Sequence, residues 1–218
     1  FAVSTLRAQD QRPNVLWIFV EDMNDWLGCY GDELVQTPNI DALAARGTRF
    51  ARAYMPAGVC SPTRSAVITG CWQTTTGTHN HRSSRGSDRI ELPKGVRPLP
   101  TILREAGYYT FNYGKTDYNF AHDAKALYDW HKPSMNFDRI GSVSKLWQPA
   151  IAQKKRFFGQ IQLRGGKNRA PAKMDRQKVS VPPYYPDVPL VREEIAHHYD
   201  VIEKTDREVG KILAALKQ

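Results

Sequence analysis

A cysteine and an arginine stand four positions apart within residues 57–70, and both side chains can take part in the chemistry of an anion. Ser61 and Pro62 follow the cysteine, and both residue types favour the beginning of a helix. Cys60 is then expected just ahead of a helix N-terminus, where free N–H groups and the helix dipole favour negative charge. Arg64 lies one turn further on and can direct its rigid cationic fork at the same anion. The spacing therefore predicts a nucleophile that acts on an anionic group.

A lone cysteine is more often a small buried hydrophobe, and a match as short as C-x-P-x-R arises by chance fairly often. The context of the motif favours function. The run Cys60-Ser61-Pro62-Thr63-Arg64 resembles the signature of the type I sulfatases of the alkaline phosphatase superfamily, in which this cysteine is oxidised to formylglycine. Segments on both sides resemble the same family in the same order, from Arg12 to Leu216. The chain looks most similar to glycan sulfatases such as heparan N-sulfatases and iduronate sulfatases.

The charge of the chain limits the classes of partner. The 218 residues include 31 Lys and Arg against 22 Asp and Glu, for a net charge of +9. Such an excess suits nucleic acid, an anionic surface or a polyanionic substrate. No dense basic run interleaves with aromatic residues, so nucleic acid is the weaker option, and a sulfated glycan suits the same charge. No apolar run reaches the length of a transmembrane helix.

The two ends of the chain suggest a piece of an exported enzyme. Residues 1–11 resemble the tail of a signal peptide, which favours a periplasmic, extracellular or lysosomal protein; the alternative is a disordered leader. Residues 12–218 are interpreted as the N-terminal part of a sulfatase catalytic domain. The three cysteines cannot all pair and show no C-x-x-C spacing, and Cys29 is expected to be structural.

Apolar and polar patterns predict an α/β fold. The unbroken apolar run of residues 14–20 indicates a strand that is buried on both faces. Further strands are expected at residues 48–54, 109–113 and 157–163, and helices at 38–47, after Cys60, at 99–106 and at about 191–216. This alternation predicts a central, mostly parallel sheet flanked by helices, and the resemblance implies an alkaline phosphatase/sulfatase-like fold that is incomplete at its C-terminus.

Two acidic residues, Glu21 and Asp22, follow the first predicted strand. Open α/β sheets place ligands at the carboxyl ends of their strands, and adjacent carboxylates stay ionised cheaply only when a cation shares them. A solvated acidic loop is the plainer alternative. In the family this position holds two aspartates that bind Ca²⁺. The resemblance therefore implies Ca²⁺ on Glu21, Asp22 and the modified Cys60, with further ligands beyond Gln218.

The strand at 109–113 ends in Gly114-Lys115. A lysine there is usually a solvated charge, but in the family this lysine contacts the sulfate and the formylglycine hydrate. A histidine commonly follows it, and no histidine follows closely here. The acid that protonates the leaving group is therefore open, with His122 and His131 as candidates.

Three other segments carry weaker signals. Residues 71–100 are predicted to form a surface loop in which His81, with Arg82, is a candidate substrate contact; a solvated pair of histidines is the commoner outcome. The Gly-rich basic loop at 164–169 could hold an anion. Residues 120–150 either shape a substrate cleft or cover the sheet. The apolar face of the helix at 191–216 is expected to be core.

The resemblance implies hydrolysis of a sulfate ester or sulfamate, with Cys60, Arg64 and Lys115 as catalytic residues. Hydrated formylglycine attacks sulfur, the alcohol or amine leaves, and expulsion of sulfate restores the aldehyde. The expected partners are a sulfated small molecule or glycan and a formylglycine-generating or equivalent maturation enzyme. The alternatives are a phosphate or phosphonate monoester hydrolase of the same superfamily, and a non-catalytic glycan-binding relative that keeps the thiol. A third alternative is a fragment that folds but is inactive because half its metal site is missing.

Overall fold

The computed structural model describes residues 11–86, 88–167 and 172–217. Apart from Gln11, the predicted leader lies outside these residues, as do the last two positions of the loop predicted at 164–169. The chain packs into two compact units, each discontinuous in sequence. The first unit contains the chain up to Trp17, Met55–Pro133 and Lys145–Gln160; the second contains Ile18–Tyr54, Ser134–Ser144 and Ile161–Gln218.

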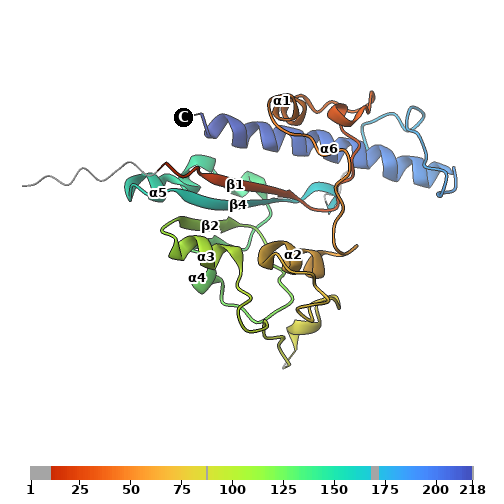
Figure 1. The fold of residues 1–218 in the computed structure, drawn as a ribbon. Helices are drawn as coiled ribbons and strands as arrows, with labels where there is room; N and C mark the ends of the chain where they lie inside the picture. The colour runs from red at the N-terminus through yellow and green to blue at the C-terminus, as the bar shows by residue number, and fades with distance from the viewer. Residues whose placement is uncertain (1–10, 87, 168–171, 218) are drawn as a thin grey trace, which may run out of the picture. The chain divides into compact units, whose positions relative to one another are not determined.

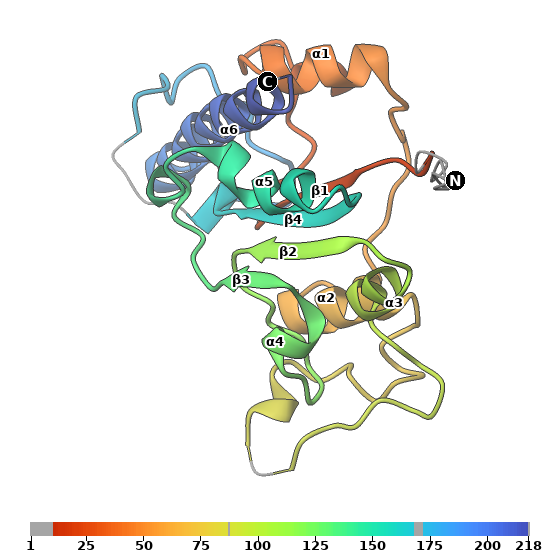
Figure 2. The same cartoon turned by 90° about the vertical axis from the view of Figure 1, so that its left-hand side faces the viewer.

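The central sheet has four strands in the order β1-β4-β2-β3. They are β1 (Val15–Val20), β2 (Tyr109–Tyr113), β3 (Trp130–Lys132) and β4 (Phe157–Leu163). β2 pairs with β3 in parallel, with Phe111 opposite Trp130, and the two strands lie side by side in Figure 2. The predicted α/β class, a central parallel sheet flanked by helices, is confirmed.

The burial of β1 differs from the prediction. Every residue of β2 and β4 is buried, whereas every residue of β1 is only half-buried. The prediction that the run at 14–20 is buried on both faces is therefore wrong. β1 is an edge strand of the sheet. In the described part of the chain only β4 pairs with it, and no strand covers its other edge.

Three of the four predicted strands are present, as β1, β2 and β4. The fourth, at residues 48–54, is wrong, because this segment is exposed and belongs to no strand. Side-chain contacts hold it instead. Arg49 donates to the carbonyl of Cys29, and the hydroxyl of Tyr30 donates to the carbonyl of Phe50. The short strand β3 was not foreseen, because three residues are too few to show a period.

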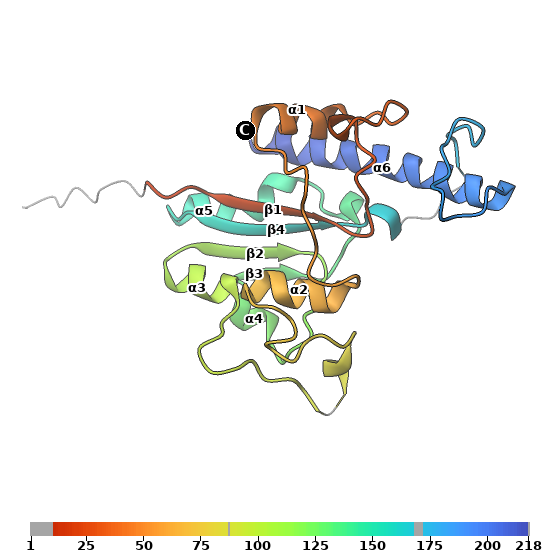
Figure 3. The same ribbon diagram turned by 45° about the vertical axis from the view of Figure 1, so that its right-hand side comes forward.

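Among the described residues, four α-helices belong to the first unit: α2 (Cys60–Thr69), α3 (Leu99–Glu105), α4 (Ala124–Leu127) and α5 (Gln148–Ala152). Figure 3 shows α2 and α3 side by side, and residues of the two helices are in contact. Gly107 has a φ of 90° and turns the chain from α3 into β2, which a residue with a side chain would do only under strain. Short 3-10 helices occur at Gly28–Tyr30, Ser83–Arg85, Phe137–Arg139, Val143–Leu146 and Gly165–Lys167.

An aromatic cluster forms part of the core of the first unit. Trp147 stacks on Phe157 with ring centroids 5.9 Å apart, and Phe111 lies 6.5 Å from Trp147. Gly159 makes room for this cluster, because a Cβ there would lie 2.0 Å from the ring of Phe111. The buried Trp147 therefore covers the sheet, which is one of the two roles predicted for residues 120–150.

The second unit contains α1 (Pro38–Arg46) and α6 (Pro189–Ala215), which lie side by side in Figure 1. Ile195, Tyr199 and Ile202 of α6 pack with Leu27 and Val35 in one buried cluster. The prediction that the apolar face of this helix is core is confirmed. In the described parts of the chain no helix is long and apolar enough to cross a membrane.

The N-terminus of α1 is held from another helix. Thr37 precedes α1, as predicted, but its side chain makes no capping hydrogen bond. The buried carboxylate of Asp206 in α6 accepts from the backbone N–H groups of Asn39 (3.0 Å) and Ile40 (2.8 Å) and from the side-chain amide of Asn39 (2.7 Å). A carboxylate at this position also opposes the positive end of the α1 dipole.

We expect Asp206→Ala to lower the free energy of unfolding by about 3 kcal/mol, because it leaves donors of α1 without their charged acceptor. Urea denaturation followed by circular dichroism measures this change. The exposed Glu33→Ala of the same unit is the control, with an expected effect within about 0.5 kcal/mol. Equal effects of the two substitutions would contradict the capping role.

Candidate active site

Helix α2 begins at the candidate nucleophile. Cys60 is the first residue of the helix, and Val59 before it is extended and makes no side-chain cap. Gly70 ends the helix, with a φ of 67° and an N–H that donates to the carbonyl of Ala66 at 2.8 Å. The sequence predicted that the helix begins just after Cys60, with Ser61 as a candidate cap. In the structure the helix begins one residue earlier, at Cys60 itself.

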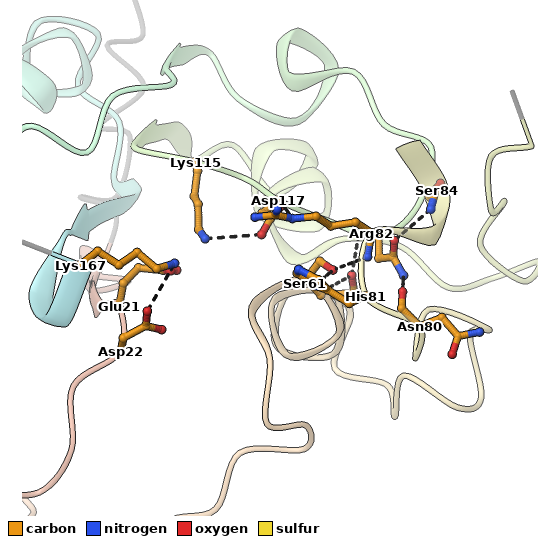
Figure 4. A network of polar contacts seen from close by, with 12 residues as sticks. Glu21, Asp22, Ser61, Asn80, His81, Arg82, Ser84, Lys115, Asp117 and Lys167 are labelled. Carbon is orange, nitrogen blue, oxygen red and sulfur yellow. Dashed lines mark hydrogen bonds and ion pairs between the residues drawn. The ribbon is translucent and has the colours of Figure 1, made fainter. Parts of the chain in front are cut away.

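Ser61 does not cap α2 because its hydroxyl is used in another contact. The buried Oγ accepts from the backbone N–H of Arg82 at 3.0 Å and lies 3.0 Å from Nδ1 of His81 (Figure 4). Because the Arg82 N–H already donates to Oγ, the hydroxyl proton can be donated to Nδ1. Ser61 thus attaches His81, the predicted substrate contact, to the first turn of the helix that begins at Cys60.

The loop that carries His81 has a second attachment. The side-chain amide of the buried Asn119 donates to the carbonyls of Thr78 and Asn80, and its oxygen accepts from the N–H of Ser84 at 3.1 Å. The described residues between 71 and 98 contain no strand and one short 3-10 helix, as expected for a loop, and the last two residues of the predicted loop begin α3. Thr78 is fully buried, however, so the loop is anchored rather than a freely exposed surface segment.

Lys115 and Arg82 share the carboxylate of Asp117. Nζ of Lys115 lies 3.4 Å from Asp117 Oδ2, and Nε of Arg82 lies 3.7 Å from Asp117 Oδ1 (Figure 4). The Asp117 side chain is only 4% exposed, and its φ of 49° is in the left-handed region that aspartate tolerates better than most residues. The buried Arg64 donates to the carbonyl of Lys115 at 3.4 Å. The structure therefore brings Arg64, Lys115 and the His81 loop together in the first unit.

The two candidate leaving-group acids are engaged elsewhere. His122 pairs with Thr116 Oγ1 at 3.2 Å and with the carbonyl of Phe120 at 2.9 Å. His131 lies on β3, where its Nδ1 is 3.1 Å from Nδ2 of Asn112. Burial lowers the pKa of its imidazole, so the protonated form that could act as an acid is less populated. Neither contact points to leaving-group chemistry.

Glu21 and Asp22 follow β1 and lie in the second unit. The ammonium of Lys167 forms an ion pair with Glu21, whose side chain is 4% exposed, and lies 3.7 Å from Asp22 Oδ2 (Figure 4). The ammonium of Lys167 is therefore a cation of the chain itself that faces both carboxylates.

Two glycines set the position of Lys167. A Cβ at Gly165 would lie 2.1 Å from the carbonyl oxygen of Glu21, and a Cβ at Gly166 would lie 2.1 Å from that of Asp22. The N–H of Gly166 also donates to the Glu21 carbonyl at 2.9 Å. This part of the loop, in which the sequence suggested an anion site, packs on the backbone of the acidic pair.

The acidic pair fits a hard cation in part. Carboxylate oxygens are the ligands that Ca²⁺ prefers, and the ion pair with Lys167 shows that the buried Glu21 already faces a positive charge. Within residues 11–86, 88–167 and 172–217, no group of three or more His, Cys, Asp and Glu side chains could hold a metal. The described residues therefore offer carboxylate ligands but not a complete calcium site.

Cys29 behaves as the structural cysteine that the sequence predicted. Its backbone N–H donates to Asp41 at 2.8 Å, and burial together with the Asp41 carboxylate raises the pKa of its thiol. A raised pKa lowers the fraction of reactive thiolate.

Sequence reasoning missed the roles of Asp117, Asn119 and Lys167. The positions of Asp117 and Lys167, at or near the ends of β2 and β4, were a usable signal, because ligands of α/β sheets gather there. The role of Asn119 had no such signal. The sequence alone does not show whether a side-chain amide hydrogen-bonds to a distant loop or to water.

Comparison with known proteins shows the family to which the chain belongs. The family model described as Sulfatase matches residues 13–218. An ulvan-active sulfatase of Formosa agariphila is 28% identical over 250 aligned positions, which cover 95% of this chain and 41% of the relative. Human iduronate 2-sulfatase is 35% identical over 123 positions, which cover 55% of this chain and 22% of that protein.

Solved structures share the fold. A 2-O GAG sulfatase superposes with a TM-score of 0.66 at 21% identity, over 95% of this chain and 55% of that one. The chain thus spans less than two thirds of the length of these relatives. Because the family model covers nearly all of the sequence, the chain belongs to the sulfatase family.

Proposed function

We propose that the protein to which this chain belongs hydrolyses a sulfate ester on a glycan, with Cys60 as the nucleophile in the form of formylglycine. The observation that carries this proposal is the arrangement of the first unit, in which Cys60 opens α2 while Arg64 and Lys115 lie against one another. Membership of the sulfatase family supports it.

The chain's own residues supply electrostatic stabilisation. A group bound at Cys60 lies at the N-terminal end of α2, where the helix dipole favours an anion. Arg64 is buried, so its charge is weakly screened, and Lys115 adds a second cation. Fixed cations lower the barrier when they face charge that develops as the ester bond breaks. His81, attached to Ser61, is assigned to the substrate.

Two groups that the family uses are part of the proposal. Formylglycine at Cys60 supplies, when hydrated, a hydroxyl that can attack sulfur and an aldehyde that can be restored. Glu21 and Asp22 would hold Ca²⁺, which when bound would supply positive charge that favours loss of a hydroxyl proton and neutralises sulfate charge. Formation of formylglycine would require a maturation enzyme in the host. We further propose that the protein is an exported sulfatase.

A glycan is the proposed substrate class. The ulvan-active sulfatase and iduronate 2-sulfatase are named for sulfated sugars, and a net charge of +9 suits a polyanion. The sugar, the sulfate position and a choice between ester and sulfamate are left to a substrate screen.

Peptide mass spectrometry across Cys60 tests the nucleophile. The longest natural chain is expressed in a host that converts a control sulfatase. The expected result is a Cys60 peptide that has lost H₂S and gained one oxygen. An unmodified thiol would overturn the formylglycine mechanism and favour a binding protein. A panel of aryl sulfates and matched aryl phosphates tests the reaction, and preference for the phosphates would support a monoester hydrolase instead.

Lys167→Met tests the cation that faces the acidic pair. Without calcium we expect the free energy of unfolding to fall by about 2 kcal/mol, because the buried Glu21 loses its partner. Added calcium is expected to raise the melting temperature of the variant more than that of the wild type, because the ammonium no longer competes for the carboxylates.

Thermal unfolding with and without calcium, in the longest natural chain, measures both effects. The exposed Lys178→Met of the same unit is the control for lost positive charge. An equal response to calcium in Lys167→Met, Lys178→Met and the wild type would show that Lys167 does not share a site with the metal.

A further inference from the structure

The carboxylate of Asp117 lies in the first unit beside two cations, and the proposed chemistry gives it no role. Its side chain is only 4% exposed. Nζ of Lys115 lies 3.4 Å from one of its oxygens, and Nε of Arg82 lies 3.7 Å from the other (Figure 4). A buried carboxylate is stable only beside positive groups, so a carboxylate fixed at this place in turn holds the cations around it.

The segment that carries Asp117 is anchored to its surroundings. The next residue, Tyr118, is buried, and its hydroxyl lies 2.6 Å from that of the buried Tyr128. The backbone N–H of Asn119 donates to Oγ of the buried Ser65 in α2 at 2.7 Å. The carboxylate of Asp117 therefore has a fixed position relative to α2, the helix that begins at the candidate nucleophile.

Both residues of the ion pair between Arg82 and Asp117 have a left-handed backbone, with φ of 57° and 49°. This conformation is unfavourable for a residue with a side chain, persists where surrounding contacts impose it and is common at functional sites. The loop that carries Arg82 is also held by Ser61, which accepts from the Arg82 N–H, and by the side chain of Asn119. These attachments do not depend on Asp117, so fastening the loop does not explain the buried carboxylate.

Lys115 has a fixed backbone but a flexible side chain. Its carbonyl accepts a hydrogen bond from the buried Arg64 at 3.4 Å. The ammonium stands at the end of a four-carbon stem with many rotamers, and it has no planar fork that would orient it. A catalytic cation lowers a barrier most when it is already in place before charge develops. A neighbouring carboxylate at a fixed position selects the rotamers that bring the ammonium to that place.

We propose that Asp117 is a positioning residue, which holds the ammonium of Lys115 where it faces the sulfate as the ester bond breaks. The step that it serves rests on the proposed function. A carboxylate that only neutralised the cations would have the opposite effect, because removing it would strengthen the attraction of the site for an anion. The two roles therefore predict changes of opposite sign in the rate of the reaction.

Asp117→Asn removes the charge and keeps the shape of the side chain. In the longest natural chain, matured in a converting host, we expect kcat for an aryl sulfate to fall about tenfold, because the ammonium is no longer held in one place. KM should not rise, since the substrate is an anion and a negative charge has been lost. The matched control is Asp88→Asn at an exposed position of the same unit, which should leave kcat unchanged.

Two further backgrounds distinguish positioning from a general folding defect. Asp117→Asn is expected to lower kcat about tenfold again in Arg82→Met, because Lys115 remains, but not to lower it further in Lys115→Met. A folding defect would lower kcat in both backgrounds. A loss that persists in Lys115→Met, or that vanishes in Arg82→Met instead, would overturn the proposal, as would a rise in kcat/KM of Asp117→Asn itself.

Acetylation of lysines by acetic anhydride, measured by peptide mass spectrometry, tests the contact without the reaction. Lys115 should react several-fold faster in Asp117→Asn than in the wild type or Asp88→Asn, because its ammonium is no longer held by a carboxylate. The exposed Lys132 should react equally in all three proteins. Faster acetylation of Lys115, with no hydrolysis of any sulfate by the wild type, would support the positioning and fail only the proposed function. Equal acetylation of Lys115 in the three proteins would overturn the positioning, even in an active sulfatase.

Discussion

Replacing Cys60 by alanine is expected to lower the hydrolysis of aryl and glycan sulfates by at least about a thousandfold, because the proposed reaction has no nucleophile without it. Cys60 is the first residue of α2 and is only half-buried. Removing its sulfur should therefore leave the helix and the Ser61–His81 contact in place. Steady-state turnover by the longest natural chain, matured in a converting host, measures the loss.

Cys71→Ala is the matched control, because Cys71 is also half-buried and lies just after the end of the same helix. It should keep turnover within a few-fold of the wild type. Binding of a sulfated glycan to Cys60→Ala should persist, because Arg64 and Lys115 still supply positive charge. Turnover that survives in Cys60→Ala would contradict the nucleophile assignment, and equal losses in both variants would point to a folding defect.

The sequence was sufficient for the parts of the fold that local chemistry decides. The apolar run of β1, the aromatic and β-branched residues of β2 and β4, the Pro38 and Gly47 limits of α1 and the Gly70 stop of α2 all follow from the side chains at those positions. The segment at 48–54 shows where this reasoning fails. Its residues favour a strand, but a strand also needs a neighbour, and residue preferences cannot show whether one is present.

For the candidate site, too, the sequence predicted the residues of the local motif but not the contacts between distant segments. Motif spacing predicted Cys60, Arg64 and Lys115, because resemblance to a family fixes residue types along the chain. It could not show that Asp117 lies between Lys115 and Arg82, since these contacts depend on where β2 ends and how the loop at 71–100 returns. Contacts between side chains distant in sequence come from tertiary packing, which local patterns do not encode.

Lys115→Met is expected to lower kcat/KM for a sulfate ester by about 10²–10³-fold, with most of the loss in kcat. Lys115 follows the end of β2, and its backbone carbonyl accepts a hydrogen bond from Arg64. The charge of its ammonium matters most as negative charge develops on the reacting sulfate ester. Lys115→Arg should recover only part of the activity, because a planar guanidinium cannot replace a compact ammonium.

The control is Lys132→Met, since Lys132 is exposed and lies opposite Tyr113 in the β2–β3 pair, near the same strand end. An equal loss in this control would mean that Lys115 acts only through overall positive charge. A second test concerns Asp117, whose buried carboxylate lies 3.4 Å from the lysine. If Lys115 served only to neutralise that carboxylate, adding Asp117→Asn to Lys115→Met would restore turnover. We expect the double variant to stay as inactive as the single one, because the cation is needed by the substrate rather than by Asp117.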